Sequence, residues 1–196
     1  MLMKLILATR NQDKVNEIVE ILGWPRSDIQ TMDEAGFVDE IEENGTTYEE
    51  NALIKARAVH SKTGGVVIAD DSGLGIDVLD GAPGIYSSRF AGEDTGYPEK
   101  YKKLYELLAP FLPEQWNCRF ICAIAVIFAD GREQIVRGEV TGRISPVSRG
   151  ENGFGYDPIF LLPERGLTMA ELDPAEKNRL SHRGQALAKL REILSP

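Results

Sequence analysis

Two adjacent carboxylates, Asp70 and Asp71, follow the apolar run Val66–Ala69 and precede Ser72 and Gly73. β-branched residues bounded by glycines are typical of a buried strand, and a carboxylate at its end needs a cation, a hydrogen-bond donor or water. Paired carboxylates can bind a divalent cation or move a proton, and neighbouring strand residues point to opposite faces, so the two would have different roles. A solvated turn capped by Asp and Ser fits this local sequence equally well.

A polar loop near the N-terminus could bind phosphate. The loop Thr9–Lys14 follows an apolar strand and precedes Val15, Ile18, Val19 and Leu22, whose spacing of i, i+3, i+4 and i+7 predicts an amphipathic helix. The backbone N–H groups at a helix N-terminus favour a phosphate. The loop lacks the GxxxxGK[ST] pattern, so it is not a Walker P-loop, and an ordinary capped helix start fits it nearly as well.

Two helix starts near the C-terminus also carry cations. The run Asp173–Glu176 supplies an N-cap, a proline at N1 and an acid at N3, and it is followed by Lys177. Ser181 is a plausible N-cap for a final helix that opens with His182 and Arg183. These donors beside a positive helix end favour an anion or a carbonyl oxygen, with a water-facing charged helix start as the alternative.

An acidic run and a glycine-rich loop complete the candidate residues. The run Asp39–Glu43 precedes a helix expected from Thr47 to about His60, which carries Lys55 and leads into the strand before Asp70. The loop Arg149–Pro158 is expected to expose an aromatic pair, of which Phe154 could stack on a base. Lysines for phosphates, carboxylates for Mg²⁺ and an aromatic ring for a base together predict a metal-dependent nucleotide site.

The remaining pattern predicts an α/β architecture that positions these loops. We expect one compact α/β unit without internal repeats or linkers. A β-hairpin over Phe120–Val140 is expected to form an outlying lobe of this unit. The other expected elements are a strand at Met1–Leu7, a second strand returning from Gly73 over Leu74–Leu79, a turn at Asp80-Gly81, a helix Tyr97–Leu108 with a core-facing aromatic stripe, a hairpin of Arg119–Phe128 and Gln134–Val140 around Asp130-Gly131, and a strand Ile159–Leu162.

Composition excludes several classes of function. The chain has 196 residues, 42% hydrophobic and 27% charged, with a formal net charge of −9, which argues against general binding of nucleic acid or an acidic membrane surface. No apolar run approaches the roughly 20 residues that span a bilayer, and the N-terminus lacks a signal-peptide pattern, so we expect a cytoplasmic protein. Cys118 and Cys122 would lie about 13 Å apart on one strand, too far for a disulfide, and are expected as core residues. With two histidines and no third thiol, a zinc site is disfavoured.

The chain also resembles a known family from end to end, the house-cleaning nucleoside triphosphate pyrophosphatases of the Ham1/inosine triphosphatase type. Six motifs carry this resemblance in order. They are Ala8-Thr9-x-Asn11-x-x-Lys14, Glu42-Glu43-x-Gly45-x-Thr47-x-x-Glu50-Asn51-Ala52, Ala69-Asp70-Asp71-Ser72-Gly73-Leu74, Gly81-Ala82-Pro83-Gly84-Ile85-Tyr86-Ser87, Gly153-Phe154-Gly155-Tyr156-Asp157-Pro158 and Glu176-Lys177-x-x-x-Ser181-His182-Arg183. The one departure within them is Arg10, where relatives often carry Gly or another small or neutral residue.

The resemblance implies Mg²⁺-dependent hydrolysis of the noncanonical purine triphosphates ITP, dITP and XTP to monophosphate and pyrophosphate, usually by a homodimer. It implies one domain over 1–196, an elongated mixed sheet with two lobes, the hairpin-containing lobe at about 118–142, and the nucleotide in the cleft between the lobes. Asp71 would be the catalytic carboxylate and a metal ligand, and Glu42 the second ligand. Apart from the resemblance, Lys55 is a further candidate for contact with the phosphates, because its charge could neutralise the leaving pyrophosphate. The implied substrate contacts are Thr9, Arg10, Asn11, Gln12, Asp13, Lys14, Ser72, Phe154, Gly155, Tyr156, Asp157, Lys177, His182 and Arg183.

Three other interpretations remain open from the sequence. A Maf-type pyrophosphatase would act on other nucleotides, and a non-catalytic sensor would bind ITP without releasing pyrophosphate. A phospho-acceptor receiver module also places an acidic pair at a strand end, but it needs a five-fold βα repeat that the hairpin after Arg119 interrupts. Discrimination against adenine would rest on donors facing the purine 6-position, from His182, Arg183 or backbone N–H groups, since a donor that faces another donor can reject an analogue by about 10⁴.

Overall fold

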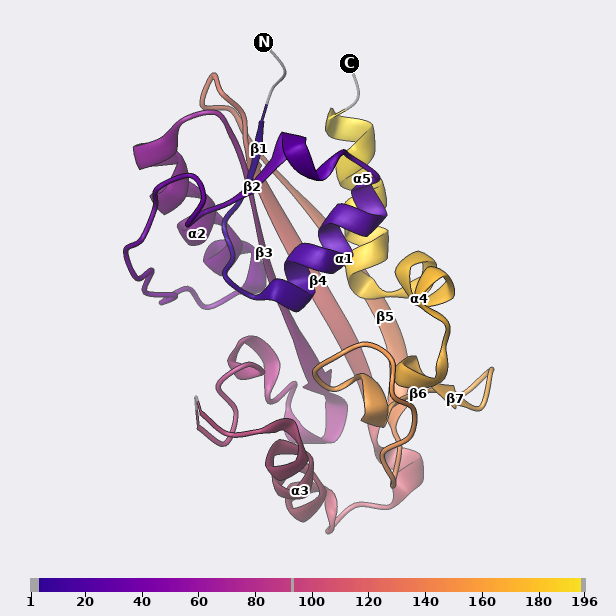
Figure 1. Cartoon of the computed structure of the whole chain (residues 1–196). Coiled ribbons are helices and arrows are strands. Elements are labelled where there is room, and N and C mark those ends of the chain that lie inside the picture. The colour runs from indigo at the N-terminus through magenta and orange to yellow at the C-terminus, as the bar shows by residue number, and fades with distance from the viewer. Residues whose placement is uncertain (1–3, 93, 195–196) are drawn as a thin grey trace. The chain divides into compact units, whose positions relative to one another are not determined.

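The computed structural model describes residues 4–92 and 94–194, and Met1–Met3 of the expected first strand lie outside them. Within these residues the chain forms one mixed seven-stranded sheet in the order β2-β1-β3-β4-β5-β6-β7, with five α-helices (Figure 1). The expected α/β class is therefore confirmed. The elements are β1 (Leu5–Leu7), α1 (Gln12–Leu22), β2 (Ile29–Thr31), α2 (Tyr48–Thr63), β3 (Val66–Ile76), α3 (Tyr97–Leu108), β4 (Asn117–Ile127), β5 (Glu133–Ile144), β6 (Phe160–Leu162), β7 (Leu167–Thr168), α4 (Pro174–Leu180) and α5 (His182–Leu194).

The chain divides into two compact units. The first comprises the described residues up to Asp71, then Cys122–Gly138, then those from Arg183 onward; the second comprises Ser72–Ile121 and Glu139–His182. Strands β3, β4 and β5 each contribute residues to both units. The hairpin predicted over Arg119–Phe128 and Gln134–Val140 forms with its Asp-Gly turn, and both of its strands contribute residues to both units.

The first unit places helices on both faces of its strands. β1 pairs in parallel with β2 and with β3, so that Leu5 lies opposite Val66. Alternate strand residues pack with α1 and α5 on one face and with α2 on the other (Figure 1). The face toward α1 and α5 includes Ile68, whereas the α2 face includes Val67 and Ala69. The helical spacing predicted after Thr9–Lys14 is therefore the pattern of a helix that buries one side.

Local capping signals produce the helix starts that the sequence predicts. The Asn11 side chain accepts a hydrogen bond from the Lys14 N–H at 3.1 Å, and Thr47 accepts one from Glu50 N–H at 3.1 Å. The Glu50 carboxylate accepts from Thr46 N–H, one residue earlier than a capping box requires. The helix α2 continues to Thr63, beyond the expected end at about His60.

The prediction that a second strand returns from Gly73 over Leu74–Leu79 is wrong. β3 continues without interruption from Val66 to Ile76, so the acidic pair lies inside an 11-residue strand and not at its end. Gly73 therefore lies within the extended backbone of β3 and does not turn the chain. The turn comes later, at Asp80 and Gly81, which have φ values of 52° and 84°.

The second unit has its own aromatic core. Phe120 and Phe160 stack with ring centroids 4.2 Å apart, and the tyrosine stripe of α3 packs against this core as expected. Tyr156, expected on an exposed aromatic pair, is buried and donates a hydrogen bond to the Ser87 carbonyl at 2.9 Å. The prediction of exposure is wrong for this residue because its ring packs against Tyr97 in an edge-to-face contact.

Several further features of the described residues agree with the sequence. Cys118 and Cys122 are buried and not disulfide-bonded. No helix within 4–92 and 94–194 combines the length and apolar character needed to cross a bilayer. The sequence did not predict β2 and β7, since strands of three and two residues are too short to show an alternating pattern.

Candidate active site

Asp70 and Asp71 face opposite sides of β3, as the alternation of strand side chains requires. On the side of α1 and α5, the Asp70 Oδ2 lies 3.0 Å from the Lys14 Nζ and 3.1 Å from the Arg183 Nη2. On the side of α2, the Asp71 Oδ1 lies 2.9 Å from the Lys55 Nζ. The expectation that the two carboxylates have different roles therefore has a structural basis in the first unit.

Asp70 is the centre of a buried ion network. Burial would raise its pKa, but Lys14 and Arg183 outweigh that effect and hold the pKa of Asp70 well below its usual range. Arg183 also binds the Glu17 carboxylate, with 2.5 Å between Nη1 and Oε2. Burial opposes the charge on Arg183, but Asp70 raises the pKa of this guanidinium above its ordinary value. Asp70 is therefore a charged anchor that holds Lys14 and Arg183.

Asp71 is in a different electrostatic state. Its side chain is buried, and burial raises its pKa to about 6, against the opposing effect of Lys55. Its Oδ2 is buried and accepts no hydrogen bond from the residues that the structure describes. A buried carboxylate oxygen without a donor is costly, so this atom is suited to a ligand that supplies positive charge.

Lys55 joins Asp71 to the acidic run. Its Nζ lies 2.7 Å from the Glu43 Oε2 as well as 2.9 Å from the Asp71 Oδ1. Burial would lower its pKa, but Asp71 and Glu43 raise the pKa of Lys55 above its usual value. Lys55 is thus a charged bridge between two carboxylates. Glu42, expected as the second metal ligand, is exposed in the irregular segment beside Glu43.

The donor set fits a hard divalent cation. No three His, Cys, Asp or Glu side chains are grouped as a metal site anywhere in residues 4–92 and 94–194. Asp71 and a neighbouring glutamate together supply two carboxylates. Mg²⁺ commonly takes one or two carboxylates from a protein, and water and phosphate complete its coordination shell. The sequence did not predict the contact between Glu43 and Lys55. Glu42 and Glu43 are adjacent in one acidic run, and only the structure shows which of them reaches α2.

The loop Thr9–Lys14 opens α1 with mostly exposed residues. Asn11 N–H donates to the Thr9 Oγ1 at 3.2 Å, and the Gln12 amide donates to Asn16 at 2.8 Å. Asp13 is exposed in the first helical turn. Among the side chains predicted here as substrate contacts, Lys14 is thus the one that the structure brings to the acidic pair.

Arg10 in the same loop is directed elsewhere. Its guanidinium donates to Asp33 and to the carbonyl oxygens of Phe37 and Asp39. The side chain that departs from the family pattern is therefore engaged with the segment that leads to Glu42.

The second unit assembles Phe154, Asp157 and Lys177. The Lys177 Nζ is 2.8 Å from the Asp157 Oδ2 and 5.0 Å from the centroid of the Phe154 ring. Phe154 N–H donates to the same Asp157 oxygen at 2.9 Å. Gly153, with φ +74°, allows this closure, because a Cβ there would lie 2.2 Å from the Asp157 carboxylate. The glycine-rich loop therefore sets an aromatic ring beside a buried ammonium group.

The structure also places His182, Gly155 and Ser72, the other predicted site residues of the second unit. His182 stacks on Phe120 with centroids 4.7 Å apart, at the start of α5. The Tyr101 hydroxyl donates to the carbonyl of Gly155. Ser72 is partly buried and directly follows Asp71 in β3. Ser72 and His182 belong to the second unit, whereas their sequence neighbours Asp71 and Arg183 belong to the first.

Comparison with known proteins gives full-length matches. A model described as the Ham1 family matches residues 5–193. The dITP/XTP pyrophosphatase of Bacillus subtilis is 48% identical over 189 residues, covering 96% of each chain. That of Bacillus licheniformis is 45% identical over 191 residues, covering 97% of each.

Solved structures match at the level of the whole fold. A HAM1 protein from Coxiella burnetii has a TM-score of 0.87 at 41% identity, over 98% of each chain. The Ham1 protein of Staphylococcus aureus also has a TM-score of 0.87, at 36% identity and over 97% of each chain.

Proposed function

The chain belongs to the Ham1 family, and from that premise we propose that it hydrolyses noncanonical purine nucleoside triphosphates to the monophosphate and pyrophosphate. The two Bacillus relatives named above are dITP/XTP pyrophosphatases, and the proposed substrates are dITP, XTP and ITP. One observation carries the proposal: a buried carboxylate, Asp71, with an unbonded oxygen and two lysines nearby on opposite faces of one strand. This combination suits hydrolysis of a phosphoanhydride.

Asp71 has the central role in the proposed reaction. It would hold Mg²⁺ together with Glu42 or with Glu43, the glutamate that Lys55 joins to it. When bound, Mg²⁺ supplies positive charge to the phosphates and lowers the pKa of water. With a pKa of about 6, Asp71 is mostly ionised at neutral pH and can accept a proton from the attacking water.

The lysines supply charge for the triphosphate. Lys14 is paired with Asp70, and Lys55 with Asp71 and Glu43, so both lysines are preorganised for the charge that develops on the leaving pyrophosphate. The helix start at Asn11 adds backbone N–H groups that favour the same anion.

The proposed contacts to the base come from Phe154, Lys177 and His182. We propose that Phe154 stacks on the purine and that Lys177 contacts a phosphate or the base edge. His182 is the stronger candidate for a donor to the purine 6-oxygen, because the Nη1 and Nη2 of Arg183 already bind Glu17 and Asp70. The Phe120 ring fixes the plane of the His182 imidazole.

The decisive experiment identifies the products. Incubation with ITP, dITP or XTP and Mg²⁺ is expected to release pyrophosphate and the monophosphate in equal amounts, and a chelator is expected to stop the reaction. IDP with orthophosphate, or no turnover, would contradict the proposal. Preference for dTTP or UTP would favour the Maf-type alternative, and binding of ITP without pyrophosphate release would favour a sensor.

Activity is expected to fall on the acidic side of pH 6. Burial raises the pKa of Asp71 to about 6, so its ionised form is lost as the pH falls through that value. We expect kcat/KM for ITP at limiting Mg²⁺ to fall about tenfold per pH unit below about 6. Because the triphosphate also titrates, carboxyl NMR of the free protein, assigned with an Asp71→Asn variant, gives the direct check: an Asp71 signal titrating near 4 would contradict it.

Three accompanying features of the proposed function are separate proposals. These are a homodimeric assembly, a cytoplasmic location and the requirement for Mg²⁺. Sedimentation at several protein concentrations tests the first, and replacement of Mg²⁺ by Ca²⁺ in the product assay tests whether the cation has to be magnesium. The net charge of −9 continues to disfavour nucleic acid as a partner.

A further inference from the structure

We propose that Arg10 is a positioning residue, which ties the loop Thr9–Lys14 to the acidic segment Val38–Asn44 and does not act mainly as a phosphate ligand. Its Nε lies 2.9 Å from the Asp33 Oδ1. Its Nη2 lies 3.1 Å from the Asp39 carbonyl oxygen and 3.4 Å from that of Phe37. One guanidinium therefore contacts three points along the chain that leads into the acidic segment.

The acidic segment needs such support. It has no regular secondary structure, and four of its seven residues are carboxylates that repel one another. The segment is held from its other side by α2, where Lys62 binds the Asp39 carboxylate and Lys55 binds Glu43. At its end, Gly45 N–H donates to the Asn51 Oδ1 at 2.9 Å. Arg10 connects the segment to the loop that leads into α1.

The contact depends on the shape of the guanidinium. Two of the three acceptors are backbone carbonyls, so Arg10 sets the path of the main chain as well as pairing with Asp33. Phe37, which is buried, anchors the same stretch. A lysine is a single point charge and cannot bind three separated acceptors with a planar fork. A partly exposed pair contributes little to global stability, so the effect is expected in local opening of the segment.

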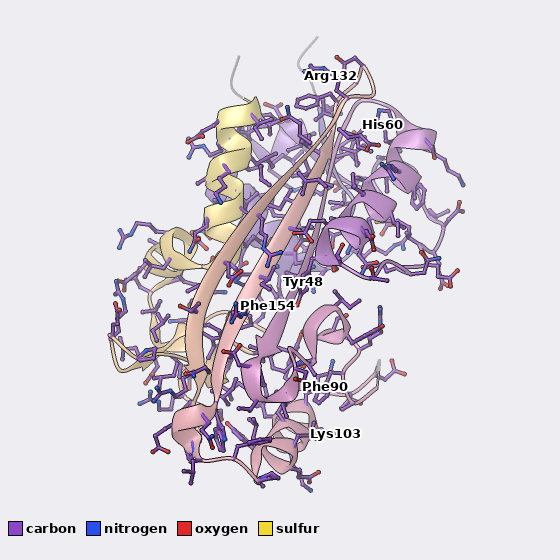
Figure 2. All side chains as sticks on the ribbon, turned by 180° about the vertical axis from the view of Figure 1, so that it is seen from behind. Tyr48, His60, Phe90, Lys103, Arg132 and Phe154 are labelled. Carbon is purple, nitrogen blue, oxygen red and sulfur yellow. The ribbon has the colours of Figure 1, made fainter. Side chains whose placement is uncertain are left out.

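The first test measures that opening directly. A protease that cleaves after glutamate is applied to the nucleotide-free protein, and cleavage after Glu40, Glu42 and Glu43 is followed by mass spectrometry. Arg10→Ala is expected to speed this cleavage about fivefold, Asp33→Asn by less, and Arg10→Lys nearly as much as alanine. Arg132→Ala is the matched control, because Arg132 pairs with Asp130 at the hairpin turn (Figure 2); its cleavage rate should equal that of the wild type.

The second test asks whether the acidic segment serves the cation. This part rests on the proposed function. Binding of Mn²⁺ to the nucleotide-free protein is measured by electron paramagnetic resonance, and Arg10→Ala is expected to raise the Kd about threefold to tenfold. The KM for ITP at saturating Mg²⁺ is expected to change less than about twofold, because the side chain does not contact the phosphates in this proposal.

Each outcome decides the proposal. Unchanged cleavage in Arg10→Ala would overturn it, as would a KM increase of about tenfold with unchanged Mn²⁺ binding, the result expected for a phosphate ligand. Failure of the proposed function looks different, since ITP would then not be hydrolysed by the wild type while the cleavage test still reports on Arg10. If Arg10→Ala does not fold, Arg10→Lys and Asp33→Asn give the same comparison.

Discussion

Asp71→Asn is expected to lower kcat for ITP hydrolysis by about 10³-fold or more, while the protein remains folded. Asparagine keeps the size of the side chain and an oxygen that can accept from Lys55, but it removes the negative charge needed to hold a cation or accept a proton. Initial rates of pyrophosphate release at saturating ITP and Mg²⁺ measure the loss. Circular dichroism and urea unfolding at pH 7 report whether the fold is retained.

The stability of this variant separates catalysis from structure. Because burial raises the pKa of Asp71, ionisation of this carboxyl disfavours the folded state as the pH rises from about 4 through 6. Removing the charge should therefore not reduce the free energy of unfolding at pH 7 by more than about 1 kcal/mol. Asp130→Asn, at the exposed pair with Arg132, is the control and should keep full activity. Activity near that of the wild type in Asp71→Asn would remove Asp71 from the mechanism.

Asp70→Asn is expected to have the largest effect on stability, a loss of about 3 kcal/mol or more in the free energy of unfolding at pH 7. The substitution leaves the buried Arg183 with Glu17 as its remaining carboxylate among the contacts described above, and it removes the charge that holds Lys14. Breaking a buried pair from one side is costly because the other charge remains out of water. Urea unfolding followed by far-ultraviolet circular dichroism measures the change.

The pH dependence gives this prediction its sign. Lys14 and Arg183 hold the pKa of Asp70 below its unfolded value, so the stabilisation is fully present above about pH 4 and is lost as the pH falls through the lowered pKa. The difference between wild type and Asp70→Asn should therefore shrink below about pH 4. Asp77→Asn, at an exposed pair with Arg119, should cost less than about 1 kcal/mol. An equally small loss for Asp70→Asn would show that the buried network does not stabilise the fold.

The pKa values of the two adjacent aspartates are shifted in opposite directions, so one strand can carry both a structural and a functional carboxylate. The ion pairs of Asp70 lower its pKa, whereas burial raises the pKa of Asp71. Groups with raised pKa values and unmet hydrogen-bonding capacity are typical of functional sites. The first carboxylate stabilises the position of Lys14, and the second is available for chemistry.

The sequence by itself determined the local elements and the residue types of the site. Caps such as Asn11, Thr47 and Asp173 act through hydrogen bonds to residues three positions away, so short-range sequence is enough to place those helix starts. Strand alternation was enough to assign Asp70 and Asp71 to opposite faces. The six motifs indicated the family, and the full-length matches confirm it.

Only the tertiary structure decided which of these residues meet. Gly73 could have turned the chain, but β3 continues to Ile76, and nothing local distinguishes a glycine that turns from one that stays extended. The choice of Glu43 as the partner of Lys55, and the direction of Arg10 toward Asp33, depend on contacts between residues 12 and 23 positions apart. Such contacts follow from packing, because a side chain pairs with whatever the fold brings within reach and not with its neighbours in sequence.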